Sequence, residues 1–265
     1  MNPKKSLGQH WLHDEASLQA MLSAGDVKSG DIVLEVGPGL GTLTAKLCDV
    51  AERVIAVELD DILAANLSQN VKKLRPDHAV KNLTVIHESI LDFDTSVLPK
   101  NYKVIANIPY YLTSHLVRIM LESSNPPSEM VLLVQKEVAQ RIAAEPGQMG
   151  ILSVTSQFYA QITLYQEVPA HLFTPPPKVD SQIVQLSYRS TPLFNDITPE
   201  LFFKLVKAGF SEKRKKLRSS LSGALGRSKP EIDKLLSSAQ IDQSARAQEL
   251  TLQEWHRLYK TFQNT

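Results

Sequence analysis

Short apolar runs alternate with amphipathic segments over the first half of the chain. Residues 31–36 (Asp-Ile-Val-Leu-Glu-Val) lead directly into Gly-Pro-Gly-Leu-Gly, which is typical of a buried strand that enters a glycine turn. The same criteria predict further strands at residues 53–58, 83–87, 102–106 and 129–135, and helices at residues 42–50, 60–74 and 112–122. This alternation requires right-handed crossovers and predicts a parallel sheet that is covered on both faces.

The pattern changes in the second half of the chain. Pro175, Pro176 and Pro177 restrict the backbone and predict a rigid loop, after which residues 179–187 are expected to form a last strand. Short amphipathic helices are then predicted at residues 199–209, 216–225, 230–238 and 248–262. We therefore expect an α/β, doubly wound domain over residues 1–189 and a small all-helical domain over residues 190–265.

Composition indicates a folded globular protein, with 43% hydrophobic and 22% charged residues. Apolar runs such as residues 130–134 are too short to cross a bilayer, and the lysines near the N-terminus precede no apolar segment. Cys48 is the single cysteine, so an internal disulfide or a cysteine-based zinc site is excluded, and the histidines lack metal-ligand spacing. We expect a cytoplasmic protein without a metal, and a monomer, since no self-association feature stands out.

Charge is distributed unevenly between the two predicted domains. Residues 190–265 contain 13 Lys/Arg and 8 Asp/Glu, whereas the first 189 residues contain 16 basic and 20 acidic residues. The densest basic run comprises Lys213, Arg214, Lys215, Lys216 and Arg218. A basic tail on a slightly acidic body favours a polyanionic partner, although a charge run of this kind is also typical of a solvated helix face.

The glycine turn and an acidic residue together indicate a nucleoside-cofactor site. Gly37, Gly39 and Gly41 allow a tight turn and close approach of a ligand to the backbone, and Glu58 ends the next predicted strand 17 residues after Gly41. A carboxylate there can accept hydrogen bonds from ribose hydroxyls. The turn alone leaves a dinucleotide and S-adenosylmethionine open; Thr42 in place of a further glycine favours the methyl donor.

A second motif, Asn107-Ile-Pro-Tyr110, follows the fourth predicted strand. The N6 amine of adenine is a poor nucleophile because its lone pair is delocalised into the ring. The side-chain oxygen of Asn107 and the carbonyl of Ile108 can accept its two N–H protons, and Pro109 favours an extended Ile108. Tyr110 can stack on the base. This set of groups indicates transfer of a methyl group to an adenine amine.

Together these segments resemble the family of ribosomal RNA adenine-N6 dimethyltransferases, which includes bacterial small-subunit enzymes and macrolide-resistance methylases acting on the large subunit. The resemblance runs nearly end to end and is carried by residues 4–12, 34–44, 57–58, 107–110, 135–141, 173–181 and 210–217. The last two segments favour the small-subunit branch.

The resemblance implies roles for individual residues. S-adenosylmethionine would be held by His10, Leu12, Gly37, Gly39, Glu58, Leu59, Glu88, Ser89 and Asn107, and the target adenine by Asn107, Tyr110 and Phe173. The sequence departs from the family at two positions: His10 stands where an asparagine is usual, and Ser89, beside Glu88, stands where an aspartate contacts the cofactor adenine. Lys213, Arg214, Lys215, Lys216 and Arg218 would bind RNA phosphates.

The implied reaction is S-adenosylmethionine-dependent dimethylation of two adjacent adenosines in the 3′-terminal hairpin loop of 16S ribosomal RNA, within a pre-assembled small ribosomal subunit. Each adenosine would have to leave its stack to reach Asn107. Two alternatives stay open: a DNA adenine methyltransferase, and a non-catalytic ribosome-assembly or RNA-binding factor.

Overall fold

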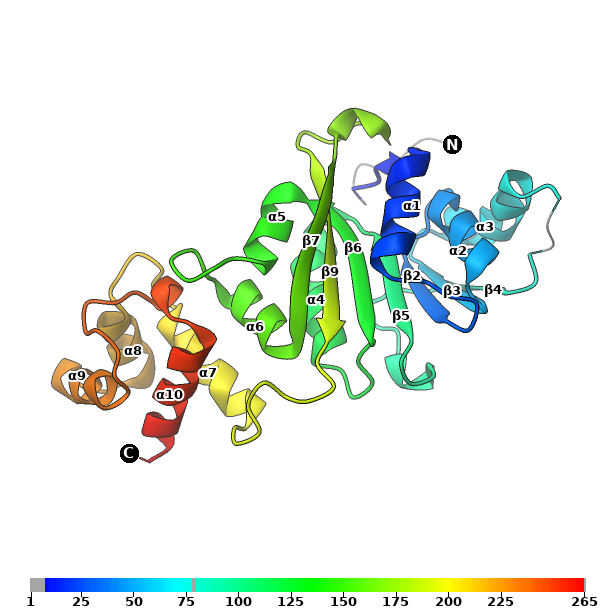
Figure 1. Cartoon of the computed structure of the whole chain (residues 1–265). Coiled ribbons are helices and arrows are strands. Elements are labelled where there is room, and N and C mark those ends of the chain that lie inside the picture. The colour runs from blue at the N-terminus through cyan, green and yellow to red at the C-terminus, as the bar shows by residue number, and fades with distance from the viewer. Residues whose placement is uncertain (1–7, 78–79, 265) are drawn as a thin grey trace. The chain divides into compact units, whose positions relative to one another are not determined.

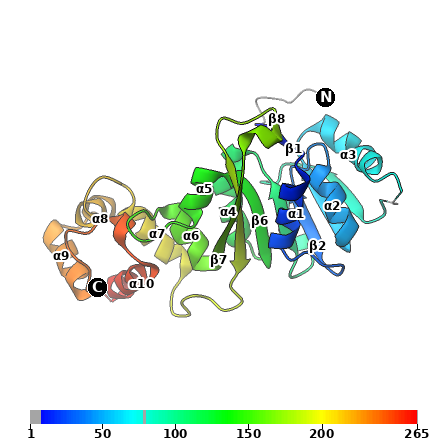
Figure 2. The same cartoon turned by 45° about the horizontal axis from the view of Figure 1, so that its top comes forward.

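A seven-stranded mixed sheet forms the centre of the first unit in the computed structural model, which describes residues 8–77 and 80–264 (Figures 1 and 2). The strand order is β4-β3-β2-β5-β6-β9-β7. The strands are β2 (Ile32–Val36), β3 (Arg53–Glu58), β4 (Leu83–His87), β5 (Lys103–Asn107), β6 (Glu129–Gln135), β7 (Ala160–Val168) and β9 (Ser181–Tyr188). β2 to β6 pair in parallel, whereas β9 is antiparallel to β6 and β7. The five strands predicted first are confirmed.

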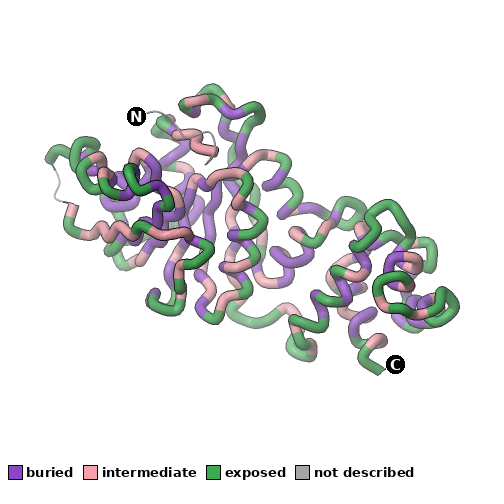
Figure 3. Tube along the Cα trace, turned by 180° about the vertical axis from the view of Figure 1, so that it is seen from behind, coloured by how far each residue is buried: buried purple, intermediate pink, exposed green. Residues whose placement is uncertain are grey.

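Helices cover both faces of this sheet. They are α1 (Glu15–Ala24), α2 (Thr42–Val50), α3 (Asp61–Leu74) and α4 (Thr113–Leu121), and α5 (Lys136–Ile142) begins directly after β6. α1 packs on α2 and β6, and α4 lies on the opposite face of the sheet (Figure 1). The inner strands are buried on both sides: residues 54–57 and 104–106 are all buried (Figure 3). Burial on both faces is the reason that their sequences are continuous apolar runs.

The structure adds elements that the sequence pattern did not predict. β7 is an edge strand, and most of its residues are exposed or half-buried, so it lacks the apolar run that marks the inner strands. A second, two-stranded sheet joins β1 (Trp11–Leu12) to β8 (Phe173–Thr174), with Leu12 opposite Phe173. Its strands are two residues long and lie far apart in the sequence, so they carry no periodic signal.

The second compact unit is helical and consists of residues 141–159 and 190–265. Its helices are α6 (Ile151–Tyr159), α7 (Pro199–Gly209), α8 (Leu217–Leu225), α9 (Lys229–Ser238) and α10 (Leu252–Gln263). The four helices expected after residue 190 are present, and α6, which was not predicted, adds Val154 and Phe158 to their core. This core surrounds the fully buried Trp255.

Two sequence features define helix starts in this unit. Ser228 and Glu231 form a capping box at α9, and Thr251 and Glu254 form another at α10. In each box the hydroxyl accepts a backbone N–H while the glutamate accepts the N–H of the cap residue, so donors that a helix start leaves unpaired are satisfied. Among residues 8–77 and 80–264, no helix is long and apolar enough to span a bilayer.

Candidate active site

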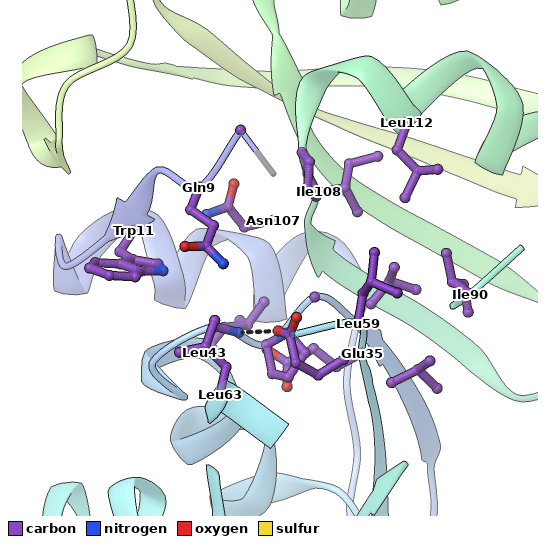
Figure 4. A pocket seen from close by; sticks show the side chains of 18 of the residues that line it. Gln9, Trp11, Glu35, Leu43, Leu59, Leu63, Ile90, Asn107, Ile108 and Leu112 are labelled. Atoms are coloured by element: carbon purple, nitrogen blue, oxygen red, sulfur yellow. Dashed lines mark hydrogen bonds between the residues drawn. The ribbon is translucent and has the colours of Figure 1, made fainter. Parts of the chain in front are cut away.

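A pocket opens at the carboxyl ends of β2, β3, β4 and β5, where ligands bind in open α/β sheets (Figure 4). The glycine turn forms one wall, and the residues that follow β4 and β5 form others. Residues 8–12, from the N-terminal part of the chain, also line it. The parallel arrangement of the sheet thus brings four separate segments of the sequence to one edge.

The turn after β2 requires glycine at three alternate positions. Gly37, Gly39 and Gly41 have φ of +65°, +58° and +88°, a region that side chains with a Cβ rarely adopt. The Gly37 N–H donates to the Val57 carbonyl (2.9 Å), which fixes the turn against β3. A Cβ on Gly39 would lie 3.0 Å from Cδ1 of Trp11, so the turn also has no room for one.

Glu58, the last residue of β3, is buried beneath this turn. Its Oε2 accepts the Gly39 N–H (3.1 Å) and its Oε1 accepts the Asp60 N–H (2.9 Å). Burial raises the pKa of its carboxyl, while these backbone hydrogen bonds act in the opposite direction. Each carboxylate oxygen retains a further lone pair, so the hydroxyls of a ribose can be accepted without breaking the existing bonds.

Glu35 is a second buried carboxyl in the pocket wall, and the sequence analysis assigned it no role. It lies in β2 with only 1% of its surface exposed, and its Oε2 has no hydrogen-bond partner among the described residues. Burial, reinforced by repulsion from Glu58, raises the pKa of Glu35 to about 8. A carboxyl with this pKa is mostly protonated at neutral pH, so Glu35 adds an uncharged polar group, and not a second negative charge, to the wall beside Glu58.

Asn107 ends β5 and projects its amide at the pocket (Figure 4). Its Nδ2 donates to the carbonyl of His10 (3.2 Å), so the Oδ1 atom is left as an acceptor for a ligand. Pro109 has an extended ψ of 132° and precedes a short 3₁₀ turn, η3 (Tyr110–Leu112). The backbone therefore turns at Tyr110, the last residue of the motif, which fixes the Ile108 carbonyl and Tyr110 relative to Asn107.

Tyr110 is held on two sides. Its hydroxyl is 2.9 Å from Oγ of Ser181, and its ring stacks on the imidazole of His10 at 5.7 Å between centroids and 19° between planes. Burial raises the pKa of the Tyr110 hydroxyl, which therefore stays protonated. His10 is fixed in turn, because its Nδ1 lies 2.8 Å from the Pro175 carbonyl. One face of Tyr110 is thus in contact with His10, and the tyrosine is pre-oriented.

The segment of residues 8–12 is attached to the pocket through several contacts. The Thr42 hydroxyl donates to the Leu12 carbonyl (2.9 Å), and Trp11 and Leu12 pair with β8. The earlier residues of the N-terminal signature, 4–7, lie outside the described residues. Loop residues with apolar neighbours give no periodic pattern, so only the family resemblance pointed to this segment.

All residues predicted to hold the cofactor line this one pocket: His10, Leu12, Gly37, Gly39, Glu58, Leu59, Glu88, Ser89 and Asn107. Tyr110 lines it as well. Phe173 does not: its side chain is only 2% exposed and packs in the apolar core of the first unit, opposite Leu12 in the small sheet. The structure also places Thr42 in the wall and adds Gln9, Trp11, Ile90 and Tyr111, to which the sequence analysis assigned no role.

The predicted RNA-binding residues belong to the second unit. Lys213, Arg214, Lys215 and Lys216 are exposed in the connection between α7 and α8. Lys215 forms an ion pair with Glu212 (2.5 Å), and Arg218 forms one with Asp233 (3.0 Å). The run is therefore a solvent-accessible cluster of cations rather than a pocket, and two of its charges are partly neutralised.

The strand order, with β9 antiparallel between β6 and β7, together with the glycine turn, Glu58 and the Asn-Ile-Pro-Tyr motif, defines a Rossmann-like methyltransferase with a helical C-terminal unit. The family model for ribosomal RNA adenine dimethylase matches residues 1–264. The chain belongs to this family, as the sequence motifs indicated.

Individual relatives agree with this assignment. The chain is 42% identical to the ribosomal RNA small subunit methyltransferase A of Dehalococcoides mccartyi over 97% of the chain and 88% of that protein. Its fold is similar to that of a dimethyladenosine transferase from Plasmodium falciparum, with a TM-score of 0.80, 26% identity and 96% and 98% of the two chains covered. The 23S ribosomal RNA methyltransferase ErmE is similar at a TM-score of 0.75 and 25% identity, over 96% and 99% of the chains.

Proposed function

We propose that this protein uses S-adenosylmethionine to dimethylate the N6 amine of two adjacent adenosines in the 3′-terminal hairpin loop of 16S ribosomal RNA. Its substrate is the pre-assembled small ribosomal subunit, and it acts as a monomer in the cytoplasm. The observation that carries the proposal is Asn107, whose amide lines the pocket and is oriented by its bond to the carbonyl of His10. The small-subunit relatives support the choice of ribosomal RNA as substrate.

The pocket fits this cofactor chemically. Glu58 offers acceptors for the ribose hydroxyls, and Leu59, Ile90 and Leu63 supply apolar surface for a base. Gly37 and Gly39 leave space for a ligand to contact the backbone. S-adenosylmethionine supplies an activated methyl group on a positively charged sulfur.

The residues of the Asn-Ile-Pro-Tyr motif activate the target amine. Asn107 Oδ1 and the Ile108 carbonyl accept its two N–H groups, which favours a tetrahedral nitrogen with an available lone pair. Tyr110 stacks on the adenine through the face that His10 leaves free, contributing on the order of 1–3 kcal/mol. No strong general base is required, because the methylated amine is acidic and loses its proton readily. The main contribution of the protein is alignment.

Phe173 contributes the second aromatic surface on the target base. Its ring is buried in the described structure, so it reaches the base only if β8 moves relative to the core. β8 is two residues long and pairs with β1 alone, and such a short pairing is weak. Entry of the flipped adenosine is the event that would expose the ring.

RNA affinity comes from the second unit. Lys213, Arg214 and Lys216 are exposed, and neutralisation of phosphates by such side chains makes binding dependent on salt. Contacts of these side chains with phosphates do not distinguish one RNA sequence from another, since the phosphates are identical along the RNA. The proposal therefore assigns attachment to the basic run and chemistry to the pocket.

A labelling experiment tests the reaction and the substrate together. The protein is incubated with labelled S-adenosylmethionine and small ribosomal subunits that lack this modification, and the RNA is digested to nucleosides. The proposal expects N6,N6-dimethyladenosine from two neighbouring positions, and no label in DNA or large subunits. Label in DNA alone would favour a DNA adenine methyltransferase, and cofactor binding without any label would favour an assembly factor; either result would overturn the proposal.

A further inference from the structure

The cofactor pocket contains a buried donor that lacks a partner. The indole Nε1 of Trp11 is shielded from solvent and has no hydrogen-bond partner in residues 8–77 and 80–264. A buried N–H without an acceptor is unfavourable, because it has lost its hydrogen bond to water without gaining another. Trp11 lines the pocket, and a ligand that displaces the glycine turn slightly from the Nε1 edge of its ring can satisfy this N–H. Trp255 also has an unpaired Nε1, but it lies in the apolar core of the second unit, where no ligand is needed to explain its burial.

The N–H edge of the Trp11 ring lies at the glycine turn. A Cβ built on Gly39 would lie 3.0 Å from Cδ1 and 3.1 Å from Nε1 of Trp11. The backbone of Trp11 is held by pairing with Thr174, and the neighbouring Leu12 carbonyl accepts the Thr42 hydroxyl. In Figure 4 the indole nitrogen is on the side of the ring that faces the pocket interior. The donor is therefore placed by the fold.

The order of the strands indicates which part of the cofactor lies beside Trp11 at the glycine turn. Along the sheet edge, Ser89 follows β4, Glu58 ends β3, the glycine turn follows β2, and Asn107 ends β5. Under the proposed function, on which this inference rests, Glu58 binds the ribose and Asn107 faces the methyl group. The amino-acid arm is then the part of S-adenosylmethionine that lies at the glycine turn, beside Trp11.

The amino-acid arm of S-adenosylmethionine contains one group that can accept a hydrogen bond from an indole N–H. The arm carries an ammonium, which only donates, and a carboxylate, which only accepts. The positive end of the α2 dipole lies at Thr42, also in the pocket wall, and favours an anion. We propose that Trp11 Nε1 donates a hydrogen bond to the α-carboxylate of S-adenosylmethionine, making Trp11 a cofactor-binding residue that selects for the intact amino-acid arm.

Affinities of two cofactor forms test this assignment. Trp11→Phe retains an aromatic ring and removes the N–H. We expect the Kd of S-adenosylmethionine, measured by calorimetry, to rise about tenfold or more, as expected for one hydrogen bond to a charged group. The Kd of decarboxylated S-adenosylmethionine, which keeps the ammonium, is expected to change less than twofold. Comparing the two forms within one variant separates the lost hydrogen bond from altered packing.

Trp255→Phe is the matched control, because it makes the same chemical change at the other tryptophan of the chain. It is expected to leave both affinities unchanged, and its remaining fluorophore, Trp11, then reports cofactor binding directly. Equal weakening of the two cofactor forms by Trp11→Phe, or an unchanged affinity for S-adenosylmethionine, would overturn the assignment. Failure of the wild-type protein to bind S-adenosylmethionine would instead refute the proposed function itself.

Discussion

The pocket of the first unit and the basic run of the second unit are built on opposite principles. In the pocket, Glu58 and Asn107 end the parallel strands β3 and β5 on either side of β2, and each is oriented by hydrogen bonds to backbone atoms. The basic run lies in an exposed connection, and its charges either face solvent or pair with nearby acids. Chemistry needs fixed geometry, whereas attraction to a polyanion needs only charge at the surface. Substitutions in the pocket should therefore lower the reaction rate, whereas substitutions in the basic run should lower the affinity for the particle.

The largest effect is expected from removal of the amide of Asn107. Asn107→Ala deletes the acceptor that we propose binds the target amine, so the single-turnover rate on small subunits should fall by roughly 100-fold or more. Rapid-quench assays at saturating cofactor and particle measure this rate. Asn66→Ala, on the surface of α3, is the control and should retain the wild-type rate. A loss below tenfold for Asn107→Ala would contradict its assigned role.

Neutralising Glu35 should stabilise the protein in a manner that depends on pH. The folded pKa of about 8 exceeds the ordinary 4.5, so the folded state binds this proton more tightly than the unfolded state. Stability from this group is fully present below pH 4.5 and is lost as pH rises toward 8. Glu35→Gln, compared with wild type by urea unfolding, should gain little near pH 5 and on the order of a few kcal/mol near pH 8.

The exposed Glu52 provides the control for that series. Glu52→Gln should give a difference from wild type that does not change across the same pH range. If the stability gain of Glu35→Gln is also the same at both ends of the range, the Glu35 carboxyl is ionised in the folded protein, which contradicts a folded pKa of about 8.

Glu58→Gln should weaken cofactor binding without unfolding the chain. The glutamine side chain is uncharged and has one oxygen in place of two. One of the backbone N–H groups or ribose hydroxyls therefore loses its charged acceptor. We expect the Kd of S-adenosylmethionine to increase roughly 10- to 100-fold, measured by calorimetry at constant pH. Glu88→Gln, in the same pocket but half-buried, should have a smaller effect. The reverse order would place the ribose at β4.

The smallest effect is expected from substitutions in the basic run, when particle binding is measured at low salt. Replacing Lys213, Arg214 and Lys216 together by Gln should weaken particle binding about tenfold at moderate salt. It should also reduce the slope of log affinity against log salt by about 2–3, one contact for each lost charge. Gln at the exposed Lys204, Lys207 and Lys234 removes the same net charge and serves as the control. An equal slope for both triple variants would remove any special role of the basic run.

The parts predicted from sequence are those with a local physical signature. Apolar runs such as residues 54–57 indicate inner strands. Gly37 and Gly39 were predicted because a tight turn requires glycine, and Glu58 because a ribose requires hydrogen-bond acceptors. β7 was missed because an exposed edge strand lacks an apolar run. Trp11 and Glu35 were missed because their roles arise from tertiary contacts: Trp11 lies on a turn 28 residues away, and Glu35 is indistinguishable from any strand residue until its burial is known. The family resemblance supplied His10 and Phe173, and Phe173 lies outside the pocket wall.

The division of labour between the two regions is tested most directly by one crossed measurement. The single-turnover rate at saturation and the particle Kd are determined for wild type, Asn107→Ala and the Lys213/Arg214/Lys216→Gln variant. We predict that Asn107→Ala lowers the rate and keeps particle affinity, while the basic-run variant lowers affinity and keeps the rate at saturation. If both variants lose rate and affinity in equal proportion, the pocket and the basic run do not have separate roles.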